Sequence, residues 1–291
     1  LMSAAVLAAW FVGGALLAPH PANITGLPAD LAVETVTVPV RGAPPLRGWW
    51  VEGTAGQPAV LLLHGIRADR RAMLGRARLL HRHGYSVLLV DLQAHGESRG
   101  DAITLGARES RGVVAARDWM KQRVPGRRLA VIGVSLGGAS VVLAPRSGGF
   151  DAVVLEAVYS NARQAVRNRI AMRLGDGMAE LLAPLLTMQT RWRIGVSVDD
   201  LSPLDRIRDL DAPLLVVAGG RDRHTLPAES RALFERARAP KEFWLLPDAA
   251  HVDFLAHSGA GYERRVVGFL DRSLSVSPSR GAGQPVPSGR D

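Results

Sequence analysis

A serine between two glycines carries the strongest chemical signal in the chain. Residues 133–137 read Gly-Val-Ser-Leu-Gly, with Ser135 at the centre. The apolar run before this motif predicts a strand, and the run after Gly137 predicts a helix. A helix N-terminus behind the serine favours negative charge on an oxygen that develops there during acyl transfer. The motif therefore predicts a nucleophile on a sharp strand-to-helix turn.

A serine nucleophile needs a base, and the base needs a carboxylate that orients it. Asp222 follows the apolar run 214–218, and His251 follows the last predicted strand, at residues 242–246. Each of the three residues lies just past a strand that we expect to be parallel to the others, and such strand ends meet at one edge of a sheet. We predict Ser135 as nucleophile, His251 as general base and Asp222 as the acid that orients it.

Another carboxylate competes with Asp222 for the role of the acid. Glu156 ends the predicted strand at residues 152–155, which follows the nucleophile in the chain. Asp248 and Asp253 lie too near His251 in sequence to reach its Nδ1 easily. Glu156 therefore stays open as the rival acid.

Two backbone amides are predicted to form an oxyanion hole. The Leu136 N–H follows the nucleophile, and the Ile66 N–H follows a His-Gly turn after the predicted strand 59–63. We expect His64 to fix this turn rather than to react. The polar residues of the segment 91–98 are expected to brace the next loop.

Strand and helix patterns alternate along most of the chain. Residues 32–40 alternate, and residues 46–52 follow after a turn, which predicts an antiparallel start to the sheet. Nearly continuous apolar runs then predict strands that are buried on both faces, with helix-period stretches between them. These runs begin near residues 59, 86, 129, 152, 214 and 242. The predicted fold class is α/β, with a mostly parallel, doubly wound sheet.

Residues 31–274 are predicted as a single domain with an insertion at about 161–198. The insertion carries two helix patterns, near 162–174 and 178–192, where one crossover would be enough. We interpret it as a short helical cap over the sheet edge at which ligands bind. Its apolar side chains pack on the sheet or favour hydrophobic acyl groups, and its arginines are interpreted as a solvated face. Residues 275–291, rich in Pro, Ser and Gly, are predicted as a disordered tail.

The first eighteen residues carry no charge and are mostly apolar. As a helix they would extend about 27 Å, just short of the hydrocarbon thickness of a bilayer. We interpret residues 1–18 as a signal peptide or membrane anchor, with an N-terminal helix packed on the domain as the alternative. Residues 19–30, rich in Pro and Gly, are interpreted as a linker. The segment predicts a membrane-anchored or exported protein.

Composition narrows the classes of partner and chemistry. The formal net charge is +9, but the basic residues are scattered arginines, with Lys121 and Lys241 the only lysines, so no nucleic acid partner is predicted. The absence of cysteine excludes disulfides, Cys-based zinc sites and a thiol nucleophile. The predicted chemistry uses no cofactor and no metal. Nothing in the composition indicates an oligomeric state.

These residues together resemble the α/β-hydrolase superfamily, over about residues 33–274. The His-Gly turn, the D-x-x-x-H-G-x-S stretch at 91–98, the Thr-Leu-Gly sequence at 104–106, the short cap and the apolar N-terminus are similar to the bacterial Bem46-like, serine-aminopeptidase-like group. The resemblance implies the catalytic order Ser135, Asp222, His251 and no metal. The sequence departs from the group at Gln93-Ala94, where an Arg-Gly pair is common, and this departure does not touch the three catalytic positions.

The function expected from these features is cleavage of carboxylic esters or thioesters of small acyl substrates through an acyl-enzyme. A serine peptidase or amidase is the first alternative, and a non-catalytic binding or scaffolding protein is the second. Serine at position 135 argues against haloalkane dehalogenase or epoxide hydrolase chemistry, because the enzymes of this fold that catalyse those reactions carry aspartate there.

Overall fold

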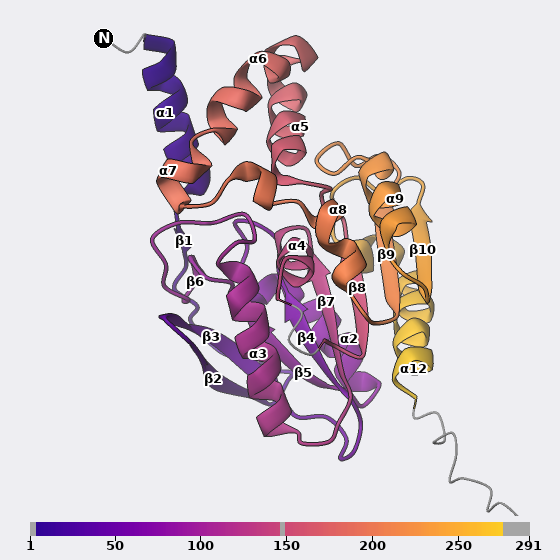
Figure 1. The fold of residues 1–291 in the computed structure, drawn as a ribbon. Helices are drawn as coiled ribbons and strands as arrows, with labels where there is room; N and C mark the ends of the chain where they lie inside the picture. The colour runs from indigo at the N-terminus through magenta and orange to yellow at the C-terminus, as the bar shows by residue number, and fades with distance from the viewer. Residues whose placement is uncertain (1–3, 146–148, 276–291) are drawn as a thin grey trace, which may run out of the picture.

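A twisted sheet forms the centre of the computed structural model, which describes residues 4–145 and 149–275 (Figure 1). Among these residues the main sheet has eight strands, in the order β10-β9-β8-β7-β4-β5-β3-β2. In chain order they are β2 (Val33–Val40), β3 (Ala43–Val51), β4 (Ala59–Leu63), β5 (Ser86–Val90), β7 (Leu129–Val134), β8 (Ala152–Glu156), β9 (Leu214–Gly219) and β10 (Lys241–Leu246).

The strand directions confirm the predicted fold class. β2 runs antiparallel to β3, and β3 runs antiparallel to β5. From β5 through β4 and β7 to β10, every neighbouring pair is parallel. All residues of β4, β5 and β8 are buried, as their continuous apolar sequences predict for strands covered on both faces.

Helices cover both faces of the sheet and enclose two apolar cores. α3 (Glu109–Arg123), α4 (Leu136–Val142) and α9 (Pro227–Arg236) contribute to one core, and α2 (Leu74–Arg82) and α12 (Gly268–Leu274) contribute to the other. Shorter turns of helix join these elements. They are η1 (Arg70–Met73), η2 (Val198–Asp200), α8 (Pro203–Arg206), η3 (Ile207–Asp209), α10 (Phe254–Ser258), α11 (Ala260–Tyr262) and the π-helical turn η4 (Glu263–Val267).

The inserted segment at 161–198 forms three helices near one end of the sheet (Figure 1). They are α5 (Ala162–Leu174), α6 (Asp176–Thr187) and α7 (Thr190–Ile194). Asn161 begins α5, because its side-chain oxygen accepts a hydrogen bond from the Gln164 N–H at 2.8 Å. Gly175, with φ +82°, joins α5 to α6, and the two helices pack side by side.

The N-terminal helix α1 (Ala4–Leu17) lies beside the cap helices (Figure 1). Gln189 Nε2 donates a hydrogen bond to Ala9 O at 2.9 Å, and the Arg193 guanidinium lies 3.8 Å from the centroid of the Trp10 ring. Several apolar side chains of α1 are exposed, with Phe11 at 70%. Within residues 4–145 and 149–275, no helix is both long and apolar enough to cross a membrane.

The segment interpreted as a linker contacts the domain. A short strand, β1 (His20–Pro21), pairs in parallel with β6 (His95–Gly96), and the Ile24 side chain is buried beside β3. Residues 276–291, the greater part of the predicted tail, lie outside the described residues.

Candidate active site

Ser135 lies on a strained turn between β7 and α4. Its φ of +48° and ψ of −111° are unusual for a residue with a side chain, and such strain is typical of functional turns. The neighbouring glycines are required by close packing. A Cβ atom at Gly133 would lie 2.6 Å from Gly138 Cα, and one at Gly137 would lie 2.5 Å from Leu63 O. The absence of a side chain at Gly137 thus allows the start of α4 to pack closely on the end of β4, and its absence at Gly133 allows β7 to pack closely on α4.

The Ser135 hydroxyl is buried and unpaired. The residue is 2% exposed, and Oγ has no hydrogen-bond partner among the described residues. Its backbone N–H donates to Glu156 O at 2.8 Å, so this amide is not available to a substrate oxygen. An unpaired buried hydroxyl is uncommon because it costs free energy, and it suggests a functional role.

Asp222 and His251 meet in the loops after β9 and β10. Asp222 Oδ2 lies 2.7 Å from His251 Nδ1, and Asp222 Oδ1 accepts the backbone N–H groups of His224 at 2.8 Å and Thr225 at 2.9 Å. The two backbone bonds fix the carboxylate, and the carboxylate then fixes the imidazole ring. His251 Nε2 is left as the ring nitrogen that can exchange a proton. The structure therefore brings Asp222 and His251 together.

Glu156 interacts with a different group. Arg76 Nη2 lies 2.5 Å from Glu156 Oε2, and the Tyr262 hydroxyl donates to Oε1 of the same carboxylate. Arg76 also binds Asp253, at 3.1 Å. Because Arg76 and Tyr262 bind the two oxygens of Glu156, the geometry favours Asp222 over Glu156 as the partner of His251.

The two predicted oxyanion amides belong to residues next to Ser135, one in the chain and one in space. Leu136 is the first residue of α4, and the first N–H groups of a helix have no partner within it. In the loop after β4, a Cβ atom at Gly65 would lie 3.6 Å from Ser135 Cβ, and the following residue, Ile66, lines the same cavity as Ser135. Both amides are thus adjacent to the nucleophile.

His64 joins two loops beside the site. Its Nδ1–H donates to Gly65 O at 2.7 Å, and its Nε2 accepts the Leu92 N–H at 3.0 Å. Burial lowers the pKa of His64 to about 3, so the ring is neutral and can accept the Leu92 hydrogen bond. In the second loop, Asp91 accepts the backbone N–H groups of Arg70 and Glu97 at 2.8 and 2.9 Å. His64 and Asp91 thus stabilise loops beside the site, which is the role predicted for them from the sequence.

A cavity of about 390 Å³ contains the candidate site. Ser135 and His251 both line it, and its walls include apolar side chains from several loops. Arg169 of α5 and His224 also line the cavity. The prediction that the cap arginines form a solvated face is wrong for Arg169, which is only partly exposed, and no role was predicted for His224. His224 could have been noticed because it follows Asp222 by two residues. Arg169 could not, because only the folded cap shows which arginine faces the cavity.

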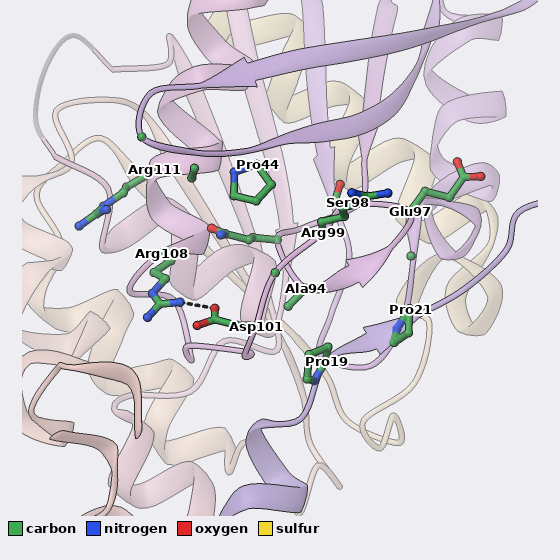
Figure 2. A pocket seen from close by; sticks show the side chains of 15 residues that line it. Pro19, Pro21, Pro44, Ala94, Glu97, Ser98, Arg99, Asp101, Arg108 and Arg111 are labelled. Atoms are coloured by element: carbon green, nitrogen blue, oxygen red, sulfur yellow. Dashed lines mark hydrogen bonds and ion pairs between the residues drawn. The ribbon is translucent and has the colours of Figure 1, made fainter. Parts of the chain in front are cut away.

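A larger cavity, of about 790 Å³, lies elsewhere (Figure 2). It is bordered by Pro19, Pro21, Pro44 and the ion pair of Arg108 with Asp101. None of Ser135, Asp222 and His251 lines it, so we assign the chemistry to the smaller cavity. Within the described part of the chain, no group of three or more His, Asp or Glu residues is arranged to hold a metal ion.

Comparisons with known proteins identify the family of the chain. The model of the alpha/beta hydrolase family matches residues 60–264. The uncharacterized protein Rv2307c of Mycobacterium tuberculosis is 29% identical over 242 residues, which cover 81% of this chain and 77% of the relative. The uncharacterized protein YfhR of Escherichia coli is 24% identical over 261 residues, or 85% of this chain and 84% of the relative.

Solved structures of the same fold extend across most of the chain. The esterase Pf2001 of Pyrococcus furiosus superposes with a TM-score of 0.74 at 23% identity and covers 89% of this chain and 98% of its own. The α/β hydrolase GrgF of Penicillium gives a TM-score of 0.66 at 21% identity, over 84% of this chain and 100% of its own. At these identities the superpositions establish the fold and not the substrate.

Proposed function

This chain belongs to the alpha/beta hydrolase family, and from that premise we propose that it is a serine hydrolase of carboxylic esters or thioesters. One observation supports this most strongly. The Asp222–His251 hydrogen bond of 2.7 Å orients an imidazole in the cavity that also contains the unpaired Ser135 hydroxyl. These are the parts that convert a serine into a nucleophile.

The mechanism follows from these positions. Ser135 Oγ attacks the carbonyl carbon while His251 Nε2 takes the hydroxyl proton, and the N–H groups of Leu136 and Ile66 stabilise the oxyanion. His251 gives the proton to the leaving alcohol or thiol, and an acyl-enzyme remains. His251 then takes a proton from water, the resulting hydroxide attacks the acyl carbon, and Ser135 departs with the proton from His251. Asp222 stays ionised and stabilises the imidazolium.

The preference for esters over amides is supported by the lining of the cavity. Ile66, Met73, Val134 and Phe254 give it a mainly apolar wall, which suits an acyl chain. The structurally similar Pf2001 is named as an esterase. These two observations support an esterase ahead of a peptidase.

Labelling with a fluorophosphonate tests whether Ser135 is activated. We expect the full chain to be labelled and to hydrolyse p-nitrophenyl acyl esters faster than aminoacyl amides, and we expect Ser135→Ala to lose both properties without loss of fold. Ser230→Ala is a matched control, because Ser230 Oγ is also buried and unpaired among the described residues but does not line the cavity. Ester turnover by folded Ser135→Ala within about tenfold of wild type would contradict the assignment.

We also propose that the apolar start of the chain binds a membrane. The motivation is the uncharged run of residues 1–18 together with the exposed side chains Leu7, Phe11 and Val12 of α1, which are costly to leave in water. Trp192 in the adjacent cap helix α7 is 67% exposed, and aromatic rings of this kind favour the lipid interface. Anchoring and export are both compatible with this property.

A further inference from the structure

One cap arginine differs from its neighbours on the same helix. Along α5, Arg163 pairs with Asp199, and Arg167 pairs with Asp176 and Glu180 at the surface. Arg169 instead lines the cavity that contains Ser135 and His251.

Among the described residues, the guanidinium of Arg169 has no ion-pair partner. Its Nη1 donates to Ala165 O of its own helix at 3.0 Å, and no carboxylate of residues 4–145 and 149–275 lies within ion-pair distance. Arginine stays protonated in proteins. A full positive charge therefore faces the cavity with a single backbone hydrogen bond.

The two carboxylates that raise the pKa of Arg169, those of Asp222 and Glu229, are occupied by other donors. Asp222 is bound by His251 and by two backbone N–H groups. Glu229 accepts hydrogen bonds from Ser160, from Asn168 Nδ2 at 2.6 Å and from the Leu226 N–H. Burial lowers the pKa of Arg169, and these carboxylates only partly oppose the effect. The charge thus carries a desolvation cost that an additional anion would offset.

His224 adds a second unused polar atom to the same wall. Its ring centroid lies 4.9 Å from that of His251, and its buried Nδ1 has no hydrogen-bond partner in the part of the chain that the structure describes. Asn168, the residue before Arg169, donates to His224 O at 3.1 Å. This hydrogen bond connects α5 to the loop of His224 and so fixes Arg169 and His224 relative to each other. Burial lowers the pKa of His224, so the ring is neutral near pH 7 and can donate from Nδ1.

We propose that Arg169 and His224 form a subsite for a carboxylate or phosphate group of the substrate, so that the enzyme prefers esters carrying a negative charge. This inference rests on the proposed function and specifies its substrate class. A guanidinium binds such groups with two parallel hydrogen bonds, and both ends of the substrate would then be held inside one cavity of about 390 Å³.

A pair of substrates that differ only in charge tests the subsite. We compare p-nitrophenyl pentanoate with the mono-p-nitrophenyl ester of glutaric acid, which has a carboxylate at the far end of the acyl chain. Wild type is expected to have the higher kcat/KM with the glutarate ester. Arg169→Gln is expected to lower kcat/KM for the glutarate ester about tenfold to a hundredfold more than for the pentanoate ester, mainly through KM.

Two further variants control for charge and fold. Arg173→Gln removes the same charge from an exposed position one turn along α5, and it should keep the wild-type ratio between the two esters. Arg169→Lys keeps the positive charge but lacks the paired N–H donors of the planar guanidinium, so it should keep part of the preference for the glutarate ester. It replaces Arg169→Gln as the test variant if Arg169→Gln does not fold. Competition by inorganic phosphate and by glutarate distinguishes phosphate from carboxylate as the bound group.

Equal losses for the two esters in Arg169→Gln, or a wild-type preference for pentanoate, would overturn the subsite and leave ester hydrolysis standing. If neither ester is cleaved and Ser135 is not labelled, the proposed function fails separately. Calorimetric binding of glutarate then decides the subsite. Binding that is lost in Arg169→Gln and kept in Arg173→Gln supports it, and binding that Arg169→Gln does not weaken contradicts it.

Discussion

At the scale of single residues, the orientation of the Asp222 carboxylate is fixed by its own loop as well as by His251. Two backbone N–H groups from its own loop hold Oδ1, so Oδ2 is the oxygen that faces the imidazole, at 2.7 Å. Its side chain is fully buried, which keeps water from competing for the carboxylate. The loop thus fixes the acid, and the acid fixes the tautomer of His251.

Replacing this carboxylate by an amide should therefore reduce catalysis strongly. We expect Asp222→Asn to lower kcat on the order of a thousandfold or more, because the amide favours the wrong imidazole tautomer. Glu156→Gln should lower kcat less and stability more, since it removes the buried carboxylate partner of Arg76 and leaves it the partly exposed Asp253, at a cost of up to about 3–5 kcal/mol. Steady-state kinetics and urea unfolding measure the two effects.

Asp248→Asn is the control, because this exposed carboxylate lies in the same loop as His251 and pairs, in the part of the chain that the structure describes, only with exposed Arg221. It should change neither kcat nor stability appreciably. A larger loss of kcat in Glu156→Gln than in Asp222→Asn would move the acid to Glu156.

Ser135, Asp222 and His251 could be proposed from the sequence because each follows an apolar run that forms a parallel strand of the sheet. Arg169 and His224 could not, because their importance depends on which side chains lack partners. That property arises only after the cap has folded over the sheet edge, and nothing in the spacing of the arginines on α5 indicates it.

At the scale of elements, His64 couples the loop after β4 to the loop after β5. The Gly65 carbonyl and the Leu92 N–H bind its two ring nitrogens, so a proton on Nε2 would break the second bond. The geometry of the Ile66 amide thus depends on a neutral His64.

Acid should therefore destabilise the protein through His64. The pKa is about 3 in the folded chain and 6.5 in an ordinary histidine, so between these values the unfolded chain binds more protons. Stability present above pH 6.5 is lost as the pH falls toward 3, by about 1.4 kcal/mol per pH unit from this group. Urea unfolding of wild type and His64→Gln between about pH 5 and 6.5 should show a shallower slope for the variant. Equal slopes would mean that His64 does not titrate in this way.

The strands were easier to predict than the cap. Residues 178–192 read as one helix, but the structure ends α6 at Thr187 and begins α7 at Thr190. Gln189, at this break, donates both to Leu185 O in the cap and to Ala9 O in α1. A contact with a helix 180 residues away cannot be seen in a local periodic pattern. The pairing of β1 with β6 escaped prediction for the same reason, since two residues give no pattern.

At the scale of the whole molecule, α1 contacts the cap along its middle and the domain at its C-terminal end. Its middle contacts the cap through Gln189 and Arg193, and beyond it β1 pairs with β6 and Leu31 is buried. Leu17, at the end of α1, is buried beside cap residues such as Ile194 and accepts a hydrogen bond from the Ile103 N–H at 2.8 Å, and the residues that follow α1 pack on the domain. The boundary for a shortened chain therefore lies at Pro19 rather than near Asp30.

A chain that begins at Pro19 should fold, hydrolyse short soluble esters at a rate close to that of the full chain, and lose binding to lipid vesicles. Sedimentation with phosphatidylcholine vesicles, with and without phosphatidylglycerol, measures the binding. A full-length chain with Leu7, Phe11 and Val12 changed to serine is the matched control, because these side chains are exposed and their loss should remove binding without disturbing the fold. Unfolding of the shortened chain, or no vesicle binding by the full chain, would refute membrane attachment through this segment.

The order of strands in the sheet also bears on the synthesis of the protein. β7, β8, β9 and β10 are neighbours in the sheet in the same order in which they leave the ribosome. A nascent chain that ends before β10 already contains the turn of Ser135 and the loop of Asp222, but it has no His251. Most of the core can then form before His251 is available, so on the proposed mechanism we expect activity only after β10 has paired with β9 and the loop that follows it is in place.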